Sequence, residues 1–319
     1  MMLTPLFSPD FTEQTDVLAG RLADSIQAYQ YDLQTGLVFV DIPAQTGQIL
    51  LFVRGQLVTV YRDDDLVERV DPATWLETLT GSNPRALMRM LALTPQDVRV
   101  FKILIEQKND LRGVFASGPS LKKQFSEWMA HPVPALGRVR WPKAEALVLF
   151  PGQSGAPYYT LFITPTQILH SAGGVNEIHA WKEEKVSSIL FSSEPRTQAW
   201  TEYLLHNAFS GLVSSLLGKI EKLIGRVMLN QIVRDVNFKA TAHDWNLSIT
   251  ASSVNDQTIF SSPEAAAEMY SRLLEVIFQH FESVLGDVML AMMVREAVYR
   301  LPAPTRQVVT EYLPVINLG

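Results

Sequence analysis

Two long stretches in the last third of the chain repeat apolar residues at helical spacing, and this pattern constrains the fold more than any other feature. The first spans 196–224 and leads into helical sequence over 226–243, and the second spans 263–300 with a break near Gly286. An apolar stripe on a helix must be buried. We therefore expect the helices to pack on each other and on a sheet, with part of either stripe available to a second protomer. The stripes are Trp200, Leu204, Ala208, Leu212, Leu216, Ile220 and Leu223, and Met269, Leu273, Ile277, Phe281, Leu285 and Met289.

A run of short strands is predicted before these helices. Pro132 and Pro134 stop any helix, so we place a domain boundary there, with domains over 1–131 and 132–319. The segments that follow are rich in β-formers and are separated by Pro and Gly, which is typical of an antiparallel meander. The predicted strands are 144–150, 158–164, 167–171, 174–181 and 186–191, with a β interruption at 245–260 between the long helices.

The first domain is predicted to begin with a helix and a small meander. The expected helix spans 15–30, and the strands are 37–40, 48–53 and 56–61, with a tight turn at Arg54-Gly55. Further helices are expected from Pro72, over 83–91 and 94–108, and around 118–130. The fold class is α+β: an N-terminal helix plus a small antiparallel meander with following helices, then an antiparallel sheet covered by long helices. No internal repeat is apparent.

Composition excludes several classes of protein. The 319 residues contain no cysteine, which rules out disulfides, thiolate nucleophiles and Cys-ligated metals. The net charge is −6 and no segment is basic, so nucleic-acid and membrane-surface binding are not expected. The N-terminus lacks the features of a secretory signal, and charges interrupt every apolar stretch, so we expect a soluble cytoplasmic protein.

Residues 15–62 resemble the PATAN (PatA N-terminal) domain family of bacterial regulators. The resemblance rests on Leu18-Ala19-Gly20-Arg21-Leu22, Gln34-Thr35-Gly36-Leu37, Gly47-Gln48-Ile49, Phe52 and Gly55-Gln56-Leu57-Val58. Gly47 and Gly55 are one residue further apart than the family pattern, which raises the question of a β-bulge. The resemblance implies a non-enzymatic signalling module that works through protein contacts, and it carries over no catalytic residue.

The sequence contains no recognisable catalytic or metal motif. Six histidines could transfer protons or bind a metal, but their spacing matches no metal site. Glu202 and His206 form a single i, i+4 pair, and His243-Asp244 is best explained as a helix C-cap. The histidines are His131, His170, His179, His206, His243 and His280. We therefore expect no enzyme activity, no cofactor and no metal.

One polar stripe is a candidate ligand site. Arg226, Asn230 and Arg234 lie at i, i+4 and i+8 of a predicted helix, with Asn237 next to them. Two guanidinium groups and two amides could bind a carboxylate or a phosphate, and the alternative is a solvated helix face.

These observations favour a non-enzymatic regulatory or scaffold protein in bacterial signalling that acts through protein–protein contacts and forms a homodimer. The methionine cluster Met289, Met292 and Met293 adds to the expectation of a dimer. The alternatives are a DNA-binding regulator with a degenerate winged-helix segment at 94–130, where Lys122 and Lys123 are nearly the only cations, and a small-ligand sensor.

Overall fold

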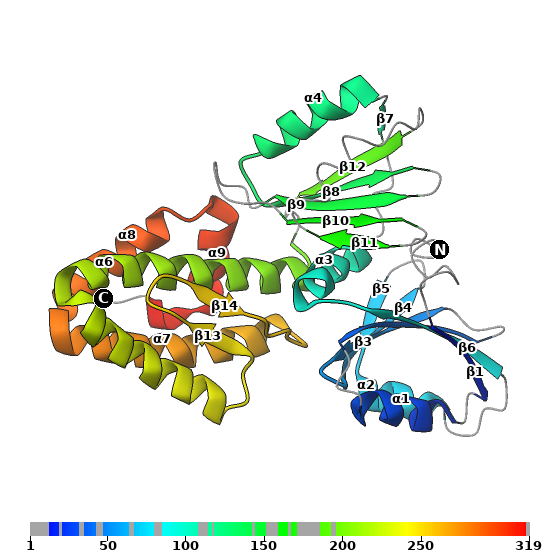
Figure 1. Ribbon diagram of the computed structural model, residues 1–319, viewed down its shortest axis with the longest axis horizontal. Coiled ribbons are helices and arrows are strands. Elements are labelled where there is room, and N and C mark those ends of the chain that lie inside the picture. Colours follow the sequence, from blue (N-terminus) through cyan, green and yellow to red (C-terminus); the bar gives the residue numbers. More distant parts are fainter. Residues whose placement is uncertain are drawn as a thin grey trace. The chain divides into compact units, whose positions relative to one another are not determined.

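The computed structural model divides the chain into two compact units, Met1–Ser192 and Ser193–Gly319, each described by itself below (Figure 1). The structure describes residues 13–18, 21–31, 35–42, 47–63, 67–79, 85–107, 114–116, 118–141, 144–150, 159–164, 167–170, 186–192 and 196–316.

The predicted boundary between 131 and 132 falls inside the first unit. Strand β7 (Val114–Ala116) precedes that boundary, but it pairs with β12 (Val186–Ser192) at the edge of a sheet. The two prolines end helix α4 (Gly118–Met129) before strand β8 (Ala135–Arg140), and so they mark a loop rather than a domain linker. The structure therefore corrects this prediction.

The first sheet of unit one has six antiparallel strands in the order β1-β6-β2-β3-β4-β5. Helix α1 (Leu22–Tyr31) follows β1, and helix α2 (Pro72–Leu79) precedes β6. Arg54 and Gly55 both have positive φ and form the predicted turn, and the register of β3 and β4 shifts after Leu51, where a bulge was in question. The strands are β1 (Glu13–Leu18), β2 (Gly36–Asp41), β3 (Gln48–Val53), β4 (Gln56–Asp63), β5 (Val67–Val70) and β6 (Arg85–Ala92).

The second sheet repeats this topology. In chain order, β7 to β12 of the second sheet correspond to β1 to β6 of the first. The strand order of the second sheet, β7-β12-β8-β9-β10-β11, is then the same as β1-β6-β2-β3-β4-β5. Helix α4 follows β7 as α1 follows β1. The register agrees as well, because Gly36 pairs with Ala92 and Phe52, and Ala135 pairs with Ser192 and Phe150. The remaining strands are β9 (Glu145–Phe150), β10 (Tyr159–Ile163) and β11 (Ile168–His170).

Each sheet packs its own helix on one face. Ile26 of α1 lies in a core with Val38, Leu50 and Phe52, and Phe125 of α4 lies in a core with Val148. The other faces of the sheets are also buried, and helix α3 (Pro95–Glu106) contacts β2 of the first sheet and β8 of the second. Unit one is thus two copies of one α+β arrangement, with α3 between them (Figure 1).

The second unit is helical except for one small hairpin. Helix α6 (Gln198–Ala242) breaks at Gly225, and α7 (Pro263–Leu285) is separated from α8 (Asp287–Tyr299) by Gly286 alone. The hairpin of β13 (Leu247–Ile249) and β14 (Val254–Asp256) joins α6 to α7, and α9 (Ala303–Tyr312) and a 3₁₀ turn (Pro314–Ile316) follow. These breaks and the hairpin lie where the sequence predicted them.

The second unit contains an internal repeat, contrary to the expectation from the sequence. Residues 209–239 align with 270–300 at a constant offset of 61 residues and without a gap. Both copies are a helix, one glycine and a helix, and each glycine has φ near 79° and ψ near 160°. The nine identical pairs are Ser210/Ser271, Leu212/Leu273, Glu221/Glu282, Gly225/Gly286, Val227/Val288, Met228/Met289, Leu229/Leu290, Val233/Val294 and Arg234/Arg295.

The two repeats are related by a pseudo-two-fold axis. Lys219 of the first repeat contacts Glu296 of the second, with Nζ 2.6 Å from Oε2. The equivalent residues reverse this contact, because His280 of the second repeat lies with Nε2 3.6 Å from Oδ2 of Asp235 in the first. A reciprocal exchange of equivalent partners is the signature of two-fold symmetry. The unit therefore has the architecture of a dimer of helical hairpins fused into one chain.

Two predicted helices are corrected. The predicted helix over 15–30 begins only at Leu22, and Glu13–Leu18 is strand β1. The predicted helix over 83–91 is strand β6, and the strand predicted over 174–181 lies outside the described residues. Within 94–130, α3 and α4 are separated by strand β7, which pairs with β12 at the edge of the second sheet. Among the helices the structure describes, each is too short or too polar to span a bilayer.

Candidate functional site

The two helical repeats carry equivalent apolar residues on their surface. We call Leu223, Val227 and Met228 lobe one, and Val284, Val288 and Met289 lobe two; together they form the paired apolar surface. Val227 and Val288 are 86% and 78% exposed, and Met228 and Met289 are 51% and 43% exposed. Isolated exposed apolar residues are common on proteins, but here each has a counterpart 61 residues away.

Other surface positions next to the glycines have diverged between the repeats. Arg226 corresponds to Asp287, and Asn230 corresponds to Ala291, whereas the exposed Val-Met pair is identical in both copies. If only buried positions had been maintained, the equivalent exposed positions of the two repeats would all be free to differ. The Val-Met pair is thus an exposed apolar feature that both repeats retain, as they also retain the exposed Arg234 and Arg295.

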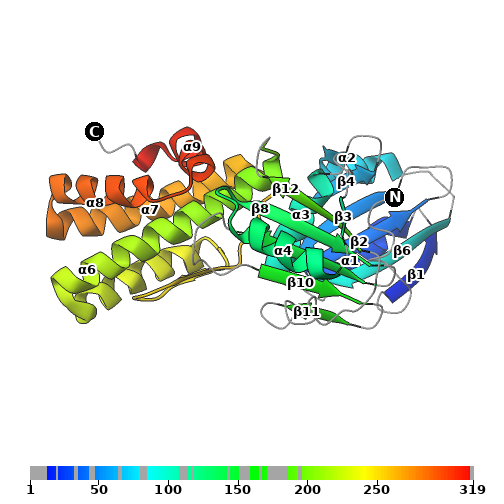
Figure 2. The same cartoon turned by 90° about the horizontal axis from the view of Figure 1, so that it is seen from above.

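Both lobes lie at the same end of the unit, because the bend of α6 and the α7–α8 junction are together at that end in both views (Figures 1 and 2). A concavity of about 640 Å³ adjoins lobe two, between α7 and α8. It is lined by Phe278, Glu282, Asp287, Val288, Leu290, Ala291, Met292 and Arg295.

The residues of the predicted anion site lie on the same half of α6. Arg226, Asn230 and Arg234 are exposed, as the solvated alternative expects. Asn237 is partly buried, and its amide is engaged: Nδ2 donates to the carbonyl of Ile249 and Oδ1 accepts from the N–H of Ile249, at 2.8 and 2.7 Å. Asn237 thus fixes strand β13 to α6. Arg226 corresponds to Asp287, which lines the concavity in the second repeat.

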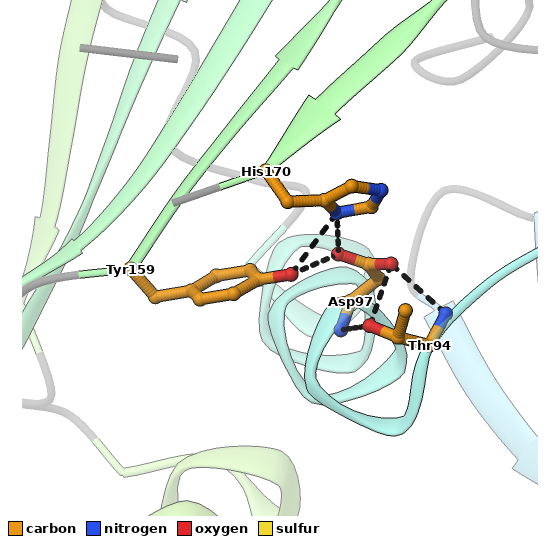
Figure 3. A network of polar contacts seen from close by, with 4 residues as sticks. All are labelled: Thr94, Asp97, Tyr159 and His170. Atoms are coloured by element: carbon orange, nitrogen blue, oxygen red, sulfur yellow. Dashed lines mark hydrogen bonds and ion pairs between the residues drawn. The ribbon is translucent and has the colours of Figure 1, made fainter. Parts of the chain in front are cut away.

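A buried carboxylate in unit one is the centre of a polar network (Figure 3). Asp97 has a fully buried side chain, and it forms a capping box with Thr94 at the start of α3. Its Oδ2 accepts from the N–H and the hydroxyl of Thr94, at 2.9 and 2.7 Å. Its Oδ1 accepts from the Tyr159 hydroxyl at 2.5 Å and lies 3.2 Å from Nδ1 of His170.

This network ties α3 to strands β10 and β11 of the second sheet. Burial and the Asp97 carboxylate raise the pKa of the Tyr159 phenol well above its usual value. The Asp97 carboxylate beside Nδ1 fixes the orientation of the His170 ring. The described donors to Asp97 belong to its helix cap and to the second sheet, so the network fastens the start of α3 to that sheet.

Unit two contains a second cluster of the same residue types. The Tyr270 hydroxyl donates to Oδ2 of Asp256 at 2.6 Å, and Nδ1 of His206 lies 2.9 Å from the same oxygen. Asp256 Oδ1 accepts the N–H of Thr258 at 2.9 Å. This cluster joins β14 to α6 and α7. His206 thus pairs with Asp256, and Glu202, one turn earlier on α6, is buried rather than on the surface.

Two of the other histidines make local structural contacts. His243 is the C-cap residue of α6 and stacks on Trp245, and His131 contacts the carbonyl of Val133. His179 lies outside the described residues. Over the ranges that the structure covers, no group of three or more His, Asp or Glu side chains could hold a metal ion.

Sequence reasoning missed both carboxylate clusters and the pairing of the exposed apolar residues, although it left part of each stripe, which include Leu223 and Met289, for a second protomer. The Asp97 and Asp256 clusters unite residues that are up to 73 positions apart, and no local motif connects them. The apolar surface did carry a signal, because Gly-x-Val-Met-Leu occurs at 225–229 and again at 286–290. Comparison of this chain with protein-family models, curated proteins and solved structures gives no match.

Proposed function

We propose that this chain is a non-enzymatic regulatory or scaffold protein in bacterial signalling that acts through protein–protein contacts of its C-terminal unit. The observation that carries the proposal is the paired apolar surface, in which two repeats expose the same Val-Met pair beside the same glycine. Exposed apolar side chains oppose solubility, and their retention in both copies is explained by contact with another protein.

The N-terminal unit fits the same proposal. The resemblance of residues 15–62 to the PATAN family implies a module that works by protein contacts, although the order of elements includes strand β1 before α1. The DNA-binding alternative has less support: α4 turns Phe125 and Trp128 into its sheet, and the exposed Lys123 lies 3.9 Å from Glu127. A recognition helix needs several free cations on one face.

The test is a comparison of three tagged proteins in the native host. The wild type is compared with the double variant Val227→Asn/Val288→Asn and with the control Glu275→Asn, which changes an exposed residue of α7 outside the lobes. Circular dichroism first establishes that all three are folded. We expect a protein that co-purifies with the wild type and the control but not with the double variant, and that binds again when the purified components are mixed.

Equal recovery of all bound proteins by the three forms would contradict the proposal, since the lobes would then contribute nothing to any contact. Retention of short DNA fragments at about 150 mM salt by the wild type would favour the DNA-binding alternative instead.

A further inference from the structure

We propose that the paired apolar surface binds the same surface of a second copy of this chain, with lobe one of each copy on lobe two of the other. The inference rests on the proposed function and names its partner. It follows from the symmetry of unit two and from the charges beside the lobes.

The symmetry restricts how two copies can meet. The pseudo-two-fold axis relates lobe one to lobe two, and both lobes lie at one end of the unit (Figure 2). Two copies that meet at this end through a two-fold axis have two choices. Either each lobe faces its own kind, or lobe one faces lobe two at both contacts. Both choices give a closed dimer.

The charges select between these choices. Arg226 and Asp287 occupy the same position in the two repeats, both are exposed, and both directly precede the exposed Val-Met pair. Contact between identical lobes would bring arginine to arginine and aspartate to aspartate. Contact between lobe one and lobe two pairs Arg226 with Asp287 of the second copy, twice by symmetry. Complementary charges favour correct register, and like charges in contact are costly.

The shapes of the two lobes are compatible with contact between lobe one and lobe two. Val227 of lobe one is the most exposed of the large apolar residues described, whereas Val288 of lobe two forms part of the wall of the concavity between α7 and α8. Met292 and Phe278 extend that wall. A projecting valine on one copy and an apolar recess on the other are complementary, and methionine adapts its shape readily to such a contact.

Charge reversal in the full-length chain tests the pairing. Arg226→Asp and Asp287→Arg should each weaken the dimer by about tenfold or more in sedimentation velocity, because each creates like-charge contacts at both sites. The double variant Arg226→Asp/Asp287→Arg should restore the dimer to within about threefold of the wild type. If identical lobes were in contact, each single change would merely exchange one like-charge pair for another and would leave the dimer unchanged.

The absence of cysteine permits a direct test of the geometry. Arg226→Cys and Asp287→Cys are prepared as single variants, and each introduces the only thiol in the chain. We expect oxidation to cross-link an equimolar mixture of the two variants, and to cross-link neither variant alone. The near approach of the two Cα atoms that a disulfide needs makes this outcome specific to the proposed contact.

Three outcomes would overturn the inference: a wild type that is monomeric at tens of micromolar, a dimer that is insensitive to both charge reversals, or cross-linking of either single cysteine variant to itself. None of them would remove the proposed function, because that is judged by loss of a co-purifying protein from Val227→Asn/Val288→Asn. A wild type that is monomeric, but whose co-purifying protein is lost in Val227→Asn/Val288→Asn, would contradict the dimer and support the proposed function.

Discussion

Gly225 and Gly286 adopt a backbone conformation that is open to glycine and strained for other residues. Their φ values are 79° and 78° and their ψ values are 161° and 160°. A Cβ at either position would meet no atom within 4 Å, so space does not require glycine there. The positive φ favours glycine instead, and this conformation allows one residue to end one helix and begin the next.

Alanine substitution at these glycines isolates that conformational effect. Gly225→Ala and Gly286→Ala should each lower the free energy of unfolding of unit two by about 1–3 kcal/mol, because positive φ is unfavourable with a Cβ. Gly218→Ala is the matched control: Gly218 is also free of contacts at the Cβ position but lies within the helix, where alanine should stabilise by about 0.5–1 kcal/mol. Urea unfolding followed by circular dichroism measures all three. Equal effects at 218 and 225 would contradict this explanation.

Tyr159 makes the stability of unit one sensitive to alkaline pH. Its pKa is raised in the folded protein, so the folded state holds the phenolic proton more tightly than the unfolded state does. The contribution is complete below the ordinary tyrosine pKa of about 10 and is lost as pH rises above it. Wild type should therefore lose stability between pH 9 and about 11 more steeply than Tyr159→Phe. Denaturant midpoints across this range provide the measurement, with the exposed Tyr299→Phe as control. Parallel curves for wild type and Tyr159→Phe would contradict it.

At the scale of elements, the two sheets of unit one fill the same space in different ways. Val38 in the first sheet corresponds to Gly137 in the second, at the third position of β2 and β8. A Cβ at Gly137 would lie 2.6 Å from Trp128 of α4 and 3.0 Å from Phe150. The large indole of Trp128 thus occupies the volume that a side chain takes in the first sheet.

Gly137→Ala should therefore destabilise unit one by about 1–3 kcal/mol through overpacking. The double variant Gly137→Ala/Trp128→Leu should show favourable coupling, because the smaller helix residue frees the space that the new methyl needs. Thermal unfolding of the two single variants and the double variant gives the coupling energy. Strict additivity would show that the two residues do not share the space.

Many elements could be predicted from the sequence because their signals are local. Pro95 after the capping Thr94 marks α3, and Pro263 after Ser262 marks α7. Strand β6 was mistaken for a helix because Arg85–Ala92 is made of good helix formers, and its pairing with both β1 and β2 outweighs that propensity. The Asp97 network could not be predicted, since it exists only when α3 and the second sheet meet.

At the scale of the whole molecule, each unit has a core of its own. The core of unit two extends from Leu204 to Ile316, and the two sheet cores of unit one lie between Leu22 and Leu190. No described sheet includes strands from both units. Pro132 and Pro134 predicted a domain boundary because a helix-to-strand loop inside a unit contains the same residue types as a linker between units.

Fragments 1–192 and 193–319 should therefore each fold when expressed separately. We expect native-like circular dichroism and cooperative thermal unfolding from both, and two transitions from the intact chain when the units differ in stability. A fragment that remains unfolded in isolation, while the intact chain folds, would show that its core depends on the other unit.

The equivalence of the helical repeats has a consequence for folding. Repeat one of one molecule offers nearly the same buried pattern to repeat two of another molecule as to its own, so the hairpins can exchange between chains during refolding at high concentration. The β13–β14 hairpin opposes this exchange, because the two hydrogen bonds between Asn237 and Ile249 hold the connecting segment on its own α6. Asn237, predicted as a ligand contact, thus holds the connecting segment on α6 and disfavours domain swapping.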